Sequence, residues 1–187
     1  MPAQPTRPLS PLVLFVQWLL FGSFGWFSGL GLGVWLTPLL AQSLGGGEDS
    51  LLPYVTMLVL GLTLGISQAL MLRSLLPESP RWVRLTLGGF VLALAGLVLF
   101  QALGLSGEGL LDDALLLILL GALVALPQWR LLRQRFANAW LWIIVSGLGW
   151  LSFLWLVAAP ASESYEFIVR GFFYGTLSLL PTGLLLL

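Results

Sequence analysis

The sequence predicts an all-α integral membrane protein with six transmembrane helices, arranged as three pseudo-repeated helical hairpins in one membrane domain, 1–187. Composition is the first observation: hydrophobic residues make up 58% of the 187 residues and charged residues only 9%, against roughly 25% charged in soluble domains. The second is a series of apolar runs long enough to cross a bilayer. The third is a pair of motifs that recurs along the chain.

Six helices are expected at 12–40, 52–76, 81–104, 110–132, 137–159 and 166–187. Clusters of glycine, proline, serine and acidic residues separate them, as in the Gly-Gly-Gly-Glu-Asp-Ser stretch at 45–50, and such clusters are typical of loops. Ser79-Pro80 is typical of a helix start, with an N-cap followed by proline at the first helical position. The apolar stretch from Leu12 is too long for a signal peptide and is taken as the first membrane helix.

A tryptophan motif, W-x6-G-[F/W], opens the first, third and fifth helices. Its copies start at Trp18, Trp82 and Trp142, spaced 64 and 60 residues apart. A glutamine motif follows in the second and fourth helices, Gly61 to Gln68-x4-Arg73 and Gly121 to Gln128-x4-Arg133; Gly175 to Thr182 aligns with its beginning in the sixth. Two motifs recurring in register indicate repeat units at about 12–76, 80–135 and 137–187, which we interpret as three hairpins around an approximate threefold axis.

Charge predicts the orientation in the membrane. With six spans, one side carries seven of the eight arginines and a single acidic residue: Arg7, Arg73, Arg81, Arg84, Arg130, Arg133 and Arg135, with Glu78. The positive-inside rule then places both termini in the cytoplasm. The expected location is a bacterial inner membrane or a thylakoid membrane.

The repeated aromatic and small residues are expected to act in anchoring and packing. Trp18, Trp82 and Trp142 are interpreted as anchors at the lipid headgroup level, with docking of a partner subunit or a flat ring ligand as the alternative. Glycines spaced by four allow helices to approach closely in lipid. The candidate interface and packing residues are Trp18, Gly25, Trp26, Gly29, Gly33, Trp82, Gly89, Trp142, Gly149 and Trp150.

The glutamine motif supplies the most polar candidate site. A polar ring of Gln68, Arg73, Gln128, Arg130 and Arg133 is the candidate for cofactor or ligand binding, and it would hold an anionic headgroup or substrate. The structural alternative has the arginines reaching lipid phosphates and the glutamines bonding between helices. The third repeat carries Thr182 and no following arginine, which argues against a symmetric threefold site.

Reactive chemistry is poorly represented in the sequence. The chain has no cysteine and no histidine, and because all eight basic residues are arginine it has no lysine either. The usual haem ligands, thiolate nucleophiles and Schiff-base lysines are therefore missing. We expect no catalytic residues, no metal site, no enzymatic activity and no nucleic-acid partner.

Two stretches, Gly65-Ile-Ser-Gln-Ala-Leu-Met-Leu-Arg73 and Pro80-Arg-Trp-Val-Arg-Leu-Thr-Leu-Gly-Gly-Phe90, carry a family resemblance. They resemble a loose group of uncharacterised bacterial membrane proteins, frequent in cyanobacteria, with repeated W-x6-G-W and Q-x4-R hairpins. Pro127-Gln-Trp-Arg-Leu-Leu-Arg133 is similar again. The resemblance covers about half the chain and implies no activity, but it favours a photosynthetic membrane.

These observations favour a non-catalytic membrane subunit, scaffold or assembly factor of a larger complex. Membrane lipids and other membrane subunits are the expected partners. The alternative is a small transporter or a lipid- or pigment-binding carrier with its site between the hairpins. Chlorophyll, carotenoid or lipid are the candidate ligands, with a glutamine side chain as a hypothetical magnesium ligand for chlorophyll.

Overall fold

A computed structural model describes residues 10–45, 47–73, 75–76, 78–105, 109–154 and 164–185. All regular structure in these residues is helical: α1 (Pro11–Leu44), α2 (Glu48–Leu72), α3 (Ser79–Ala102), α4 (Leu110–Leu132), α5 (Leu141–Trp150), the 3-10 helix η1 (Leu151–Phe153) and α7 (Ser164–Leu184). The all-helical class is confirmed. Of the described helices, the four from α1 to α4 are long and apolar enough to cross a membrane, whereas the apolar stretch Leu141–Phe153 is shorter and α7 is not among them.

Most helix boundaries lie within three residues of the expected ones, and four differ by four residues. Helix α2 runs from Glu48 to Leu72 rather than from 52 to 76. Helix α1 begins after Ser10, whose hydroxyl accepts from the backbone N–H of Val13 at 3.4 Å, and it continues to Leu44 rather than 40. It ends at Gly45, which has a φ of 68°, a left-handed conformation that glycine adopts without steric cost. Helix α5 begins at 141 rather than 137 because the preceding residues form consecutive tight turns. The expected end of that span, 155–159, lies outside the described residues.

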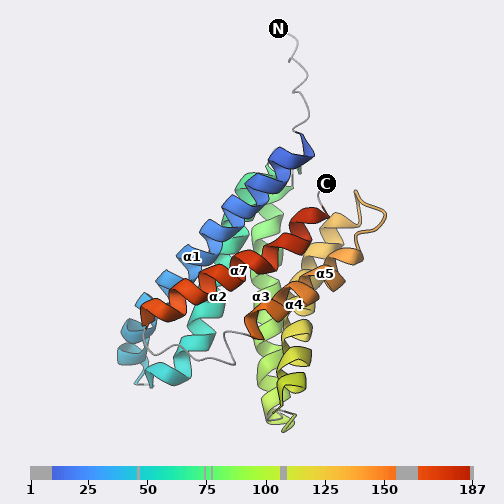
Figure 1. Ribbon diagram of the computed structural model, residues 1–187. Helices are drawn as coiled ribbons and strands as arrows, with labels where there is room; N and C mark the ends of the chain where they lie inside the picture. The colour runs from blue at the N-terminus through green and yellow to red at the C-terminus, as the bar shows by residue number, and fades with distance from the viewer. Residues whose placement is uncertain are drawn as a thin grey trace.

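The described helices form a closed ring in chain order. Each helix from α1 to α5 packs against the next, and α7 packs against both α5 and α1. Figure 1 shows this closure, with the red α7 alongside the blue α1. Because the last helix returns to the first, the inner faces of all the helices point toward one shared axis.

One end of the bundle carries most of the arginines. The α2–α3 and α4–α5 turns lie together there, near the start of α1 and the end of α7 (Figure 1). A salt bridge of 3.2 Å between Arg135 and Glu78 joins the two turns. Six of the eight arginines are in or beside these turns: Arg73, Arg81, Arg84, Arg130, Arg133 and Arg135. We call this the arginine-rich end.

The glycines of the tryptophan motif lie where paired helices touch. A Cβ atom at Gly25 would lie 2.8 Å from the Cα of Leu64, and one at Gly89 would lie 2.8 Å from the Cα of Val124. A Cβ atom at Gly149 would lie 2.5 Å from the carbonyl oxygen of Ser178. The obstacles are backbone atoms, so a larger side chain at these positions forces the two helices apart.

Replacing Gly89 with alanine should destabilise the bundle, because the added methyl group meets the backbone of α4. We expect a loss of about 1–3 kcal/mol, the usual cost of overpacking, measured by denaturant titration of the full chain in detergent.

The matched control is Gly88→Ala, one residue earlier, where an added Cβ has no atom within 4 Å. That variant should be as stable as the wild type or slightly more stable. Equal effects at the two glycines would contradict the packing described for α3 and α4.

Candidate functional site

Three tryptophans, one from each copy of the tryptophan motif, meet inside the ring. Trp18, Trp82 and Trp142 have exposed fractions of 1%, 0% and 5%. The rings of Trp18 and Trp142 are 5.5 Å apart and those of Trp82 and Trp142 are 5.8 Å apart, both edge to face. This is the favoured geometry for aromatic pairs. We call this group the tryptophan layer.

The residues that follow the motif glycines form a second aromatic layer. Trp26 and Trp150 have ring centres 6.4 Å apart, and Phe90 and Trp150 have centres 5.9 Å apart. Phe153 of η1 joins this layer, 4.9 Å from Trp26. Trp26, Phe90 and Trp150 therefore form a second layer, eight residues or about two helical turns further along their helices than the tryptophan layer.

Hydrogen bonds connect each tryptophan to the preceding repeat. Trp82 donates its indole N–H to the Oε1 of Gln68 at 3.0 Å, and Trp142 donates to the Oε1 of Gln128 at 2.8 Å. The indole of Trp18 donates to the hydroxyl of Thr182 at 3.2 Å and to the carbonyl oxygen of Leu179 at 3.3 Å. The third repeat is thus hydrogen-bonded to the first, and the hydroxyl of Thr182 accepts the indole hydrogen bond that a glutamine accepts in the other two cases.

The glycines of the glutamine motif make a matching set of contacts. Gly61 lies against the ring of Phe90, and Gly121 against the ring of Trp150. Gly175 lies against the ring of Trp26. Each glycine therefore receives the aromatic residue of the next copy of the tryptophan motif, again with the third copy returning to the first. The glutamine motif of one repeat and the tryptophan motif of the next therefore form a single helix–helix contact that recurs around the ring.

Burial corrects the interpretation of the motif tryptophans as headgroup anchors. Their indole N–H groups bond to protein atoms inside the ring rather than to the bilayer interface. The sequence did not distinguish the two cases because helices that are apolar all round give no clear inward face. The constant interval of 14 residues between Gln68 and Trp82, and between Gln128 and Trp142, was the available signal.

The candidate polar ring is divided by the structure. Gln68 and Gln128 are buried in the core, whereas Arg73, Arg130 and Arg133 are exposed at the arginine-rich end. The guanidinium of Arg133 lies 5.0 Å above the ring of Trp129, a distance that suits a cation–π contact. The glutamines and the arginines are therefore separate features.

Between the two aromatic layers lies a small void of about 40 Å³. Polar side chains border it, among them Gln68, Gln128 and Ser146. The amide nitrogen of Gln128 donates to the hydroxyl of Thr86 at 2.9 Å. Trp26 also borders the void, and its indole N–H has no partner among the described residues. Such a space suits a water molecule and nothing much larger.

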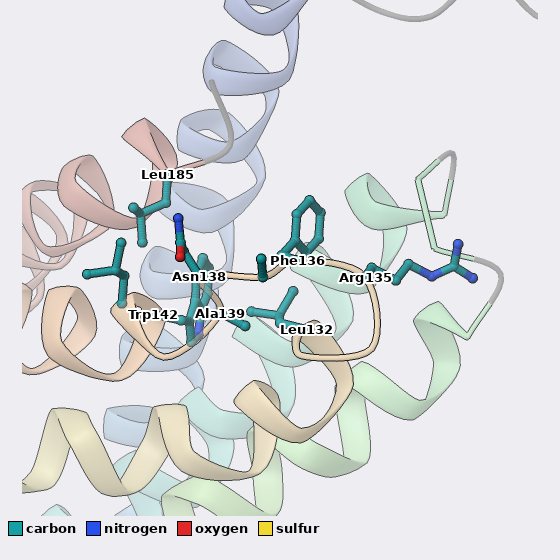
Figure 2. Close-up of a pocket in the computed structure, with 9 residues that line it drawn as sticks. Leu132, Arg135, Phe136, Asn138, Ala139, Trp142 and Leu185 are labelled. Atoms are coloured by element: carbon teal, nitrogen blue, oxygen red, sulfur yellow. The ribbon is translucent and has the colours of Figure 1, made fainter.

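A larger groove of about 400 Å³ opens at the arginine-rich end, between the α4–α5 turn and the end of α7. Figure 2 shows Phe136, Asn138 and Leu185 around it, while the Arg135 side chain extends away from them. Arg135 is also engaged by Glu78. The groove is mostly apolar, and it offers no convergent charged groups to a ligand.

The chemistry available to this interior is packing and neutral hydrogen bonding. No group of three or more metal-ligating side chains occurs in the part of the chain that the structure describes. Thr86, Thr182 and Phe90 belong to the core network, although the sequence did not single them out as site residues. Aligning the copies of the two motifs places Thr182 at the position of the two glutamines, and Phe90 at the position of Trp26 and Trp150.

Replacing Gln128 with leucine should leave the indole N–H of Trp142 buried without a partner. We expect a destabilisation of about 1–2 kcal/mol, within the range for interhelical hydrogen bonds in membrane proteins, measured by denaturant titration in detergent. Gln134→Leu is the control, because Gln134 is exposed just beyond α4. Equal stability of the two variants would show that the buried hydrogen bond does not hold the core.

Comparison of the chain with protein-family models, curated proteins and solved structures found no match in any of the three.

Proposed function

We propose that this protein is a non-catalytic, membrane-embedded structural subunit that works through its outer lateral surface. The observation that carries the proposal is the filled axis of the ring. Seven aromatic side chains of the two layers meet there, and the void between the layers is only about 40 Å³. An interior occupied in this way serves to hold the helices together rather than to bind a substrate.

The proposed arrangement in the membrane has six crossings in three hairpins, with α5–η1 and α7 as the fifth and sixth spans. Four helices that suit a bilayer by length and composition support membrane insertion. Six arginines at one end support an orientation with that end, and both termini, in the cytoplasm. The membrane would be a bacterial inner membrane or a thylakoid membrane.

The outer surface offers a partner one distinctive face. Exposed aromatic side chains gather on α1 and α7: Phe21, Phe24, Phe27, Trp35, Phe172 and Phe173. Phe27 and Phe172 also pack against each other, with ring centres 5.8 Å apart. On α3 and α4, the exposed large hydrophobic side chains in the described residues are all aliphatic. Because aromatic residues are enriched at protein interfaces, we propose the aromatic face of α1 and α7 as the contact with a larger complex.

The transporter alternative has weaker support from the geometry. A carrier with its site on the axis needs a solvated cavity of substrate size, and drug-sized ligand sites occupy about 300–1,000 Å³. A chlorophyll held by a glutamine faces a further obstacle, since the Oε1 atoms of Gln68 and Gln128 already accept buried indole hydrogen bonds. Either role would require the tryptophan–glutamine contacts to open.

Photo-crosslinking in native membranes tests the proposed face. A benzophenone amino acid at Phe24 on α1 should give protein adducts, because this side chain is 66% exposed on the aromatic face. The matched position is Leu115 on α4, which is 65% exposed on an aliphatic surface and should label lipid.

Discrete protein adducts at Phe24 but not at Leu115 are the expected result, and mass spectrometry of those adducts identifies the partner. Lipid labelling alone at both positions would contradict a subunit role. Uptake of a solute by proteoliposomes containing only this protein would support the transporter instead.

A further inference from the structure

A groove between the first and second hairpins has features that the structural role does not use. It has a volume of about 420 Å³ and lies at the arginine-rich end, where α2 finishes and α3 begins. Its lining is Ile66, Ala69, Leu70, Arg73, Ser79, Pro80 and Val83. Most of these side chains are apolar, and one cation and one hydroxyl stand at the end of the groove.

Arg73 brings an uncompensated positive charge to the groove. Its side chain makes no ion pair or hydrogen bond with the residues that the structure describes. The nearby acidic residue in the α2–α3 turn, Glu78, is bound to Arg135 at 3.2 Å. Arg73 is therefore available to an anion from outside the protein.

Ser79 is the second polar group at the groove. Although the residue as a whole is only 3% exposed, its hydroxyl is not among the fully buried polar atoms that lack a partner, which in the described residues belong to Trp26 and Thr56. Ser79 lines the groove, and its hydroxyl makes no hydrogen bond with the described residues. Since Ser79 lines the groove beside Arg73, an acceptor bound there would satisfy both groups.

The second repeat provides an internal comparison. Sixty residues further along the chain, Trp129 stands at the position of Ala69 and Arg133 at that of Arg73. Arg133 is engaged by the ring of Trp129, and Ala139 replaces the hydroxyl of Ser79. The equivalent position thus has a bulky side chain, an arginine engaged by that side chain, and no serine.

We propose that the α2–α3 groove binds one anionic phospholipid. Its phosphate accepts hydrogen bonds from the Arg73 guanidinium and the Ser79 hydroxyl, where an arginine suits a phosphate well. An acyl chain lies along Ile66 and Leu70, which are exposed on the outside of the bundle, and against the half-buried Val83. The lipid fills the place that Trp129 occupies in the second repeat, and its charge matches the arginine-rich end.

Native mass spectrometry of the full chain, delipidated in detergent and titrated with dioleoyl phosphatidylglycerol, tests this proposal. Arg73→Gln should weaken binding of the first lipid about tenfold, the loss expected for a charge-assisted contact. Arg133→Gln is the matched control and should bind as the wild type does. Ser79→Ala should weaken binding by a smaller factor, and Ala69→Trp should block the groove with the side chain that the second repeat carries.

The competing ligands decide the source of the phosphate. Dioleoyl phosphatidylcholine should bind at least about tenfold more weakly because it carries no net charge, and glycerol phosphate should not displace the lipid. If Arg73→Gln bound the first phosphatidylglycerol as tightly as the wild type, or if Arg133→Gln lost as much affinity as Arg73→Gln, the proposed lipid site would be wrong. Displacement by glycerol phosphate would overturn the assignment to a lipid. Because these lipid-binding measurements need no partner subunit, their outcome is independent of whether the proposed structural role is correct.

Discussion

The buried indole N–H of each motif tryptophan is the constraint on which the rest of the structure depends. An indole donor in a dry interior must find an acceptor or pay the cost of losing water. In two of the three cases a glutamine of the preceding repeat is that acceptor, and in the third it is Thr182 together with a carbonyl group. Since each acceptor lies on a different helix, satisfying three donors fixes the order of the whole ring.

Glycine makes this arrangement sterically possible. The motif glycines at 25, 89 and 149 let the two helices of each repeat approach closely, and those at 61, 121 and 175 leave room for the aromatic ring of the next repeat. In lipid, where apolar burial between helices gives little driving force, close packing and hydrogen bonds supply most of the association energy. The interior is therefore nearly threefold, and the departures from threefold symmetry on which our two proposals rest lie on the outside: the aromatic face of α1 and α7, and the groove beside Ala69.

Sequence reasoning predicted the helical class, most helix boundaries and the register of the two motifs, because apolar length, turn residues and exact spacings are local properties. It did not predict where Trp18, Trp82 and Trp142 would lie, since their helices are apolar on every side and a lipid-facing tryptophan looks like a core one. The Gln-x4-Arg pairing was also misleading. Five residues are about one and a half helical turns, so Gln68 and Arg73 point in different directions, one to the core and one to the end of the bundle.

Closure of the ring between α7 and α1 is the central claim, and a disulfide cross-link tests it most directly. The hydroxyl oxygens of Ser23 on α1 and Thr176 on α7 lie 3.0 Å apart, and the natural chain contains no cysteine. A Ser23→Cys, Thr176→Cys variant should form an intramolecular disulfide on mild oxidation in membranes, because the side chains are within bonding reach. A Ser23→Cys, Leu115→Cys variant should not. Failure of the first pair to cross-link, or equal cross-linking of both, would contradict the closed ring.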